Sequence, residues 1–204
     1  MHRKTIKDIR KNLCQGLFWK GIAQDDIKIK EHYTQSFKRE TIDAQKDSIN
    51  FRIGLFTSSI EYAQQRHMRN DEAFLRYTLF FFVQNPHKLQ LSLKRENFTS
   101  KLGKLFGKHD LETYNPDFDK NFLIAGNHNY AHAELLDEQL QKQLLQLKNG
   151  FTELLIQAGF IRYTESSVGT FFTKSHENRV LNLVDVGLRL AQNLEAWDPL
   201  EEPE

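Results

Sequence analysis

The densest apolar stretch of the sequence, residues 78–83, is far shorter than the roughly 18 apolar residues that cross a membrane. Its aromatic and β-branched side chains favour extended backbone, and a run of this length is typical of a buried strand. We therefore predict a strand from about Leu75 and no membrane-spanning segment. After a turn at residues 84–87, apolar and polar residues alternate over 89–94, which predicts a partner strand and a hairpin.

Further strands are predicted in the second half of the chain. Residues 118–126 contain the apolar centre Phe122-Leu123-Ile124 and predict a strand. Residues 152–163 predict a second hairpin, because two β-forming segments flank Ala158-Gly159. Residues 169–172 are a candidate for one more short strand. Short connections of this kind predict a mainly antiparallel sheet.

Helical signals occupy the remainder of the second half. Asp137 can cap a helix that Asn149-Gly150 ends, and Ser175 can cap a long final helix. The apolar stripe of that final helix consists of Val180, Val184, Gly187, Leu188, Ala191 and Leu194. Trp197 is placed to fix its end, and residues 98–106 have the spacing of a short amphipathic helix.

The first third of the chain is predicted to be mainly helical. A basic amphipathic helix begins the chain, with an apolar face made by Ile6, Ile9, Leu13 and Leu17. Residues 25–69 lack Pro and are rich in Gln, Lys and Glu, which predicts mostly helix. Residues 48–56 leave a strand interpretation open, because apolar and polar residues alternate from Ile49 to Leu55.

These elements predict an α+β fold, in which a mainly antiparallel sheet is covered by the N-terminal helical region and a long C-terminal helix. A chain of 204 residues is slightly longer than the usual single domain. We therefore expect the basic helix in residues 1–24, a single α+β domain in 25–198 and an acidic tail in 199–204.

One stretch of the chain resembles a known pattern. Residues 101–126 read KLGKLFGKHDLETYNPDFDKNFLIAG, and residues 133–163 read AELLDEQLQKQLLQLKNGFTELLIQAGFIRY. Together they resemble bacterial domains of unknown function, in which a basic hydrophobic helix leads through an acidic loop to a strand, a Leu-rich helix and a hairpin. The resemblance covers about residues 101–163 and implies a fold, with no activity attached.

Cysteine and charge limit the classes of function. Cys14 is the only cysteine, which excludes an internal disulfide and a Cys-rich zinc ribbon and favours a cytoplasmic protein. Residues 1–108 contain 21 Lys and Arg against 11 Asp and Glu, a formal charge of +10. Residues 109–204 contain 7 against 16, a charge of −9. This split predicts intramolecular complementarity, head-to-tail self-association or a basic face for an acidic partner.

His128 and His132 are candidate metal ligands, because two His four residues apart on a helix point the same way. A third ligand would come from Glu134 or Asp137. The residue after His128 is Asn129, where the zinc-protease pattern has a catalytic Glu, so that pattern is incomplete.

Three other near-motifs are also incomplete or ambiguous. Residues 103–109 have one residue too few between their glycines for a phosphate-binding loop and end in His109 in place of Ser or Thr. Residues 166–169 suit a hairpin tip better than a nucleophile turn. Asp117 and Asp119 would share a strand face and could act as acid and base, or could mark a solvated strand entry.

The leading functional prediction is a non-enzymatic binding or assembly module that acts through protein–protein contacts, either with a protein partner or by self-association as a homodimer. The first alternative is a binder of nucleic acid or an anionic surface that uses the basic first half. Its candidate residues are Arg76, Lys88, Lys94, Arg95, Lys101, Lys104 and Lys108. The second alternative is a metal-dependent hydrolase that uses Asp117, Asp119, His128 and His132. No cofactor is predicted.

Overall fold

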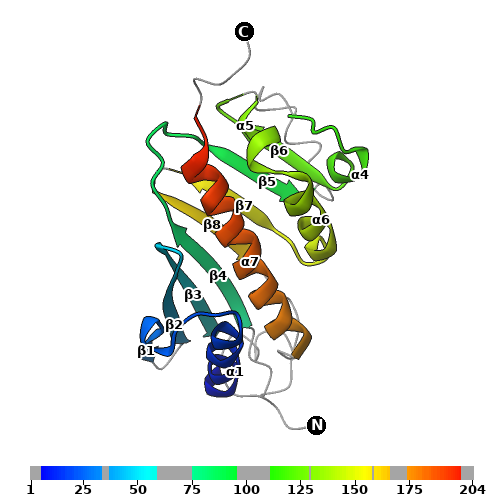
Figure 1. Ribbon diagram of the computed structural model, residues 1–204. Coiled ribbons are helices and arrows are strands. Elements are labelled where there is room, and N and C mark those ends of the chain that lie inside the picture. The colour runs from blue at the N-terminus through cyan, green and yellow to red at the C-terminus, as the bar shows by residue number, and fades with distance from the viewer. Residues whose placement is uncertain are drawn as a thin grey trace. The chain divides into compact units, whose positions relative to one another are not determined.

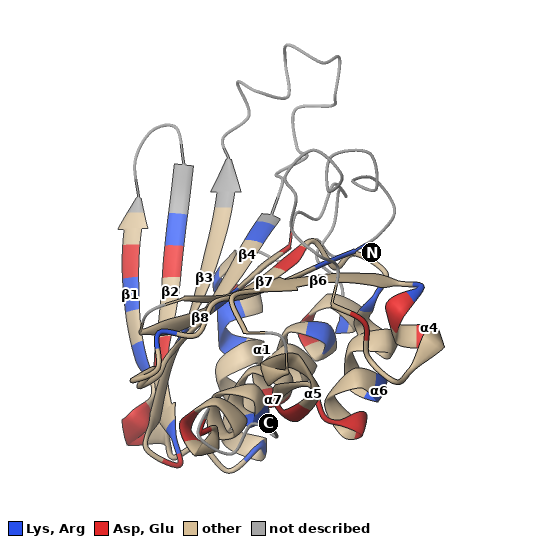
Figure 2. Cartoon of the chain, turned by 90° about the horizontal axis from the view of Figure 1, so that it is seen from above, with Lys and Arg blue, Asp and Glu red and all other residues tan. Residues whose placement is uncertain are grey.

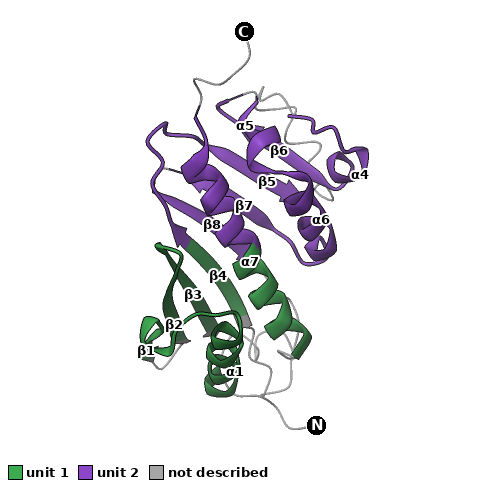
Figure 3. Ribbon diagram, in the orientation of Figure 1, with its two compact units in different colours: residues 1–80, 165–185 green, residues 81–164, 186–204 purple. Residues whose placement is uncertain are grey.

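The computed structural model describes residues 6–33, 37–58, 75–95, 111–128, 130–157, 159–165 and 174–198. The chain divides into two compact units, which Figure 3 shows in different colours. Unit 1 contains residues 1–80 and 165–185, and unit 2 contains residues 81–164 and 186–204. The predicted acidic tail and the predicted short helix at 98–106 lie outside the described residues.

The described strands form one sheet in the order β1-β2-β3-β4-β8-β7-β5-β6 (Figure 1). The five strand pairs with a described register are all antiparallel. Together with the N-terminal helix and the long C-terminal helix, this sheet confirms the predicted α+β class. Among the described residues, no helix combines the length and apolarity that a membrane crossing requires.

Unit 1 contains α1 (Ile6–Trp19), the 3₁₀ turn η1 (Gln24–Asp26) and the strands β1 (Lys28–Tyr33), β2 (Phe37–Lys46) and β3 (Ile49–Ser58). Most of β4 (Leu75–Phe82) and the first half of α7 (Lys174–Ala196) also belong to it. The predicted N-terminal helix is therefore confirmed, and its buried residues include Ile9, Leu13 and Leu17.

The prediction of mostly helix over residues 25–69 is wrong for its described part, which forms β1, β2 and β3. The open alternative at 48–56 was the correct one, because Ile49, Phe51, Ile53 and Leu55 are all buried on one face of β3. β1 misled the prediction because its Lys and Glu side chains are exposed on both faces of an edge strand. The backbone ladder to β2, and not side-chain burial, holds that strand in place.

Unit 2 contains β5 (Leu91–Arg95), β6 (Phe122–Gly126), β7 (Glu153–Gln157) and β8 (Phe160–Glu165), with the last residue of β8 in unit 1. Its helices are α4 (Pro116–Asp119), α5 (Ala131–Leu135), α6 (Glu138–Leu147) and the second half of α7. The predicted β7–β8 hairpin is confirmed, with Gly159 at φ +83° in its turn.

The predicted hairpin between the strands at 75–83 and 89–94 is wrong. β5 pairs with β6 along one edge and with β7 along the other. The connection is fixed by Asn85, whose side chain bonds both the N–H and the carbonyl of Leu89 and lies 3.4 Å from the carbonyl of Gln157. The chain thus passes β8 and β7 to reach the position of β5 and does not fold back on β4.

The cap of α6 and the apolar stripe of α7 are confirmed. The Asp137 carboxylate accepts a hydrogen bond from the Leu140 N–H, and Gly150 follows the helix at φ +91°. All predicted stripe residues of α7 are buried, as is Trp197. Ser175 lies inside α7, which already includes Lys174, so its predicted capping role is wrong.

Candidate functional site

His128 and His132 do not form the helical pair that the sequence suggested. α5 begins at Ala131, so His128 precedes the helix, and its ring contacts Trp197 at a centroid distance of 5.1 Å. His132 is buried, with Nε2 2.9 Å from the Glu112 carbonyl oxygen. In the described ranges no three His, Cys, Asp or Glu side chains gather as a metal site would require.

Asp117 and Asp119 lie on a helical turn, α4, and not on the predicted strand. Asn115 caps this turn, and Pro116 at its start favours helical backbone. Asp119 accepts hydrogen bonds from the backbone and hydroxyl of Thr113, whereas Asp117 is exposed. The two carboxylates therefore have different surroundings and do not share a face.

Cys14 is half-buried in α1. Burial raises the pKa of its thiol, and the nearby Arg10 guanidinium only partly offsets this effect. A thiol with a raised pKa is a poor nucleophile at neutral pH. The candidate segments 103–109 and 166–169 lie outside the described residues.

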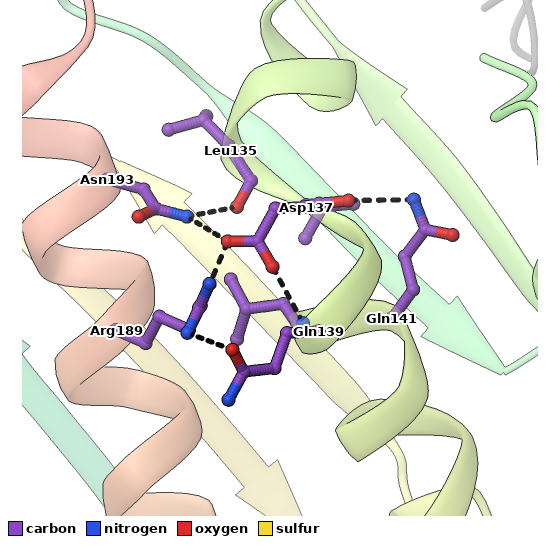
Figure 4. A network of polar contacts seen from close by, with 8 residues as sticks. Leu135, Asp137, Gln139, Gln141, Arg189 and Asn193 are labelled. Atoms are coloured by element: carbon purple, nitrogen blue, oxygen red, sulfur yellow. Dashed lines mark hydrogen bonds and ion pairs between the residues drawn. The ribbon is translucent and has the colours of Figure 1, made fainter.

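Asp137 joins α6 to α7 (Figure 4). Its carboxylate accepts hydrogen bonds from Arg189 at 2.9 Å and Asn193 at 3.0 Å, in addition to the helix cap. Burial opposes ionisation of Asp137, but these donors outweigh it and lower the pKa of the carboxyl. Asn193 also bonds the Leu135 carbonyl. These bonds hold α6 against the second half of α7, so the network stabilises unit 2.

In the sheet of unit 1 the strand carboxylates and most of the strand cations lie on opposite faces; Lys46, which donates to the Lys20 carbonyl, is a cation of the covered face. One face is covered by α1 and α7, and Figure 2 shows these helices on one side of the strands. The strand carboxylates Glu31, Glu40 and Glu165 lie on this covered face with helical partners. Arg10 of α1 contacts Glu31 and Glu40, and Arg179 of α7 bonds Glu165 at 2.9 Å.

The opposite face of the same strands carries mainly cations. The β1–β2 and β2–β3 registers place Lys28, Lys30, Arg39 and Arg52 on this face, together with His32. Arg76 of β4 joins them, because it alternates with buried Tyr77 and Leu79. We call the set Lys28, Lys30, Arg39, Arg52 and Arg76 the basic sheet face. Asp43 is the only acidic side chain that the described strand residues add to it.

Asp43 orders two of these cations. Arg52 bonds both of its carboxylate oxygens, and Lys30 lies 3.3 Å away. The hydrogen bond from Arg52 is the main cause of the lowered pKa of Asp43. The face therefore has a formal charge of +4, and Lys28, Arg39 and Arg76 are exposed on it.

An aromatic stack lies beside these charges. The Arg39 guanidinium lies over the Phe56 ring, 5.0 Å from its centroid. Phe56 in turn leans over Gly54, since a Cβ at Gly54 would be 3.1 Å from a ring carbon. Gly54 thus leaves room for the ring, and Arg39 presents the outer surface of the stack.

The charge split between the sequence halves is much weaker between the folded units. Unit 1 contains 17 Lys and Arg and 13 Asp and Glu, a charge of +4, and unit 2 contains 11 and 14, a charge of −3. The acidic residues of 165–185 join the basic N-terminal part in one unit. Charge is therefore organised by sheet face more than by position in the chain.

Only Arg76 of the predicted basic residues belongs to the basic sheet face. Lys88, Lys94 and Arg95 are in unit 2, where Lys94 lies 3.2 Å from Glu153. Lys101, Lys104 and Lys108 lie outside the described residues. The other members of the face were not predicted, because in the helix predicted over residues 25–69 their side chains would point in different directions. The available signal was the alternation of basic residues at 28 and 30, which places them on one face of a strand.

No protein-family model and no curated protein sequence matches this chain. Among solved structures, the mycobacterial trehalose monomycolate transport factor A, TtfA, is similar over 92% of this chain and 93% of its own. The sequence identity is 7% and the TM-score is 0.42.

Proposed function

We propose that the protein is a non-enzymatic binding module and that its basic sheet face binds single-stranded nucleic acid. The observation that supports this proposal is the uneven distribution of charge across the sheet of unit 1, with most of the strand cations on the face opposite α1 and α7. Phosphate groups are attracted to such a face, and the release of their counterions drives binding.

The aromatic stack favours a single strand over a duplex. Unpaired bases stack on aromatic rings and on Arg guanidinium planes, and a flat sheet presents such groups side by side. Arg39 over Phe56 offers a planar cationic surface of this kind. A paired base in a duplex has no free face to place against it.

Fluorescence anisotropy with a labelled single-stranded oligonucleotide tests the proposal at several salt concentrations. Each phosphate neutralised on a single strand contributes about −0.7 to the slope of log K against log salt. A net charge of +4 therefore predicts a slope of up to about −2.8, and each removed cation should reduce its magnitude by about 0.7. A slope near zero, or no binding at low salt, would refute the proposal.

Variants separate this face from general positive charge. Arg39→Ala and Arg76→Ala should each weaken binding, and Phe56→Leu should weaken it with little change of salt slope, because it removes stacking and no charge. Lys142→Ala is the matched control, since Lys142 is an exposed cation of unit 2 with Glu138 at its side. Equal effects of Lys142→Ala and Arg39→Ala would show that the face has no special role. Binding of polyglutamate in place of the oligonucleotide would indicate an acidic protein partner.

A further inference from the structure

The outer side of α1 combines lysines with an unusual pair of exposed aromatics. Lys7, Lys11 and Gln15 are exposed and spaced by four, so they follow one side of the helix, and exposed Asp8 lies beside the two lysines. Phe18 and Trp19 continue that side at the end of the helix, with 56% and 75% of their surface exposed. Large exposed aromatics at the end of a basic helix are typical of an interaction surface.

A second exposed surface, in unit 2, combines aromatics with the opposite charge. His132 of α5 lies 2.9 Å from the Glu112 carbonyl and thereby holds the segment before α4 against the first turn of α5. Glu112 and Tyr114 lie on this segment, and Tyr130 and Glu134, spaced by four, follow the outer side of α5; all four are exposed. Tyr114 is 100% exposed and Tyr130 55% exposed. Asp117 adds a further carboxylate, and Lys120 at the end of α4 a single positive charge.

We propose that the chain self-associates head to tail, with the outer side of α1 in one copy docked on this acidic aromatic surface of a second copy. Lys7 and Lys11 would face Glu112, Asp117 and Glu134, and the aromatic pair of α1 would pack against the two tyrosines. Complementary charge selects this pairing, and aromatic contact supplies most of the buried apolar area.

Symmetric pairing of like surfaces is disfavoured by the same charges. Two α1 surfaces would bring lysines together, and two acidic surfaces would bring carboxylates together. If β1 of one copy paired antiparallel with β1 of a second copy about a two-fold axis, the centre of the pair would have Lys30 opposite Lys30 or Glu31 opposite Glu31. Like charges directly opposite each other destabilise a sheet, so this edge resists self-pairing. The interface is therefore heterologous and leaves one surface of each kind free at the ends of the assembly.

Sedimentation velocity over a range of protein and salt concentrations tests the proposal. The chain mass is 24.0 kDa, and the average mass should rise with protein concentration and fall as salt is added. An α1 variant, Phe18→Ser with Trp19→Ser, and a unit 2 variant, Tyr114→Ser with Tyr130→Ser, should each remain at the mass of one chain. All four residues are exposed, so both variants should keep the native circular dichroism spectrum.

Mixing the two variants gives the decisive result. Each retains the surface that the other lacks, so an equimolar mixture should form a species of two chains and nothing larger. A native protein that stays at one chain mass at every concentration would overturn the proposal, as would a mixture that remains monomeric. Variants that still associate alone would place the interface elsewhere. Binding of anionic vesicles by the native chain without self-association would assign α1 to a membrane surface instead.

Discussion

Replacing Gly187 with alanine should destabilise the protein, although Ala is the better helix former. Gly187 lies inside α7, where the change alone would favour folding by about 1 kcal/mol. A Cβ at this position would lie 2.1 Å from two carbons of the Phe81 ring and 2.7 Å from a third. Phe81 is 1% exposed, so its ring cannot swing into solvent. Overpacking of a core costs about 1–3 kcal/mol, and contacts this short favour the upper end.

We therefore expect a net loss of about 2 kcal/mol for Gly187→Ala. Urea unfolding followed by circular dichroism should show a lower midpoint, by about 1 M if m is about 2 kcal/mol/M, with m unchanged. In a Phe81→Leu background the smaller side chain leaves space, so the added methyl should cost much less or stabilise the protein. Gln192→Ala, at an exposed position of the same helix, is the control. An unchanged midpoint for Gly187→Ala, or an equal loss in the Phe81→Leu background, would refute the steric argument.

Three further perturbations test other parts of the fold. Ser48→Gly should stabilise the β2–β3 turn by about 1 kcal/mol. Asp47 and Ser48 have φ of +49° and +66°, a region that only Gly adopts without cost. The melting temperature should rise, and a lower one would contradict this reasoning. The pKa of Asp137 is lowered in the folded protein, so ionised Asp137 stabilises the fold above about pH 4, and this stabilisation is lost as the pH falls through the folded-state pKa. The difference in unfolding free energy between the native chain and Asp137→Asn should therefore shrink in acid. Tyr77→Phe should cost about 1–3 kcal/mol in urea unfolding, because the Tyr77 hydroxyl donates to buried Glu165; no loss would show that Glu165 does not need this donor.

The sequence was most informative where apolar residues repeat and a cap marks the end of an element. The α7 stripe, the Asp137 cap and the β7–β8 turn all depend on neighbours in sequence, and each was predicted correctly. The partner of β5 was not predictable in this way. β6 and β7 are distant in sequence, and the Asn85 side-chain bonds that redirect the chain also involve Gln157, far along the chain.

The basic sheet face was not predicted because the polar composition of its strands suggested helix, and the alternation of apolar and polar residues that marks a strand is weak there. β1 exposes both faces, so no buried apolar period marks it as a strand. In β2, Glu40 is buried on the same face as Ile42 and Ala44. Because one buried position is charged, the apolar residues of this strand do not show a clear period of two. That Glu is stabilised by Arg10 of α1, a contact between distant parts of the chain. Once the strands are known, each charged residue can be assigned to a face, because successive side chains of a strand point to opposite faces of the sheet.

The two proposed surfaces of unit 1 are on opposite sides of its sheet, which gives a prediction that joins them. α1 covers one face, and the basic sheet face is the other, so a strand of nucleic acid and a second copy of the chain would not compete. Head-to-tail assembly would then present several basic sheet faces to one long strand and raise its apparent affinity through effective concentration. The native chain should therefore bind a long oligonucleotide more tightly than one that covers a single face. The Phe18→Ser, Trp19→Ser variant should lose this advantage and keep its affinity for the short strand. If the variant weakens binding to both lengths equally, α1 contacts the nucleic acid itself, and the two surfaces are not independent.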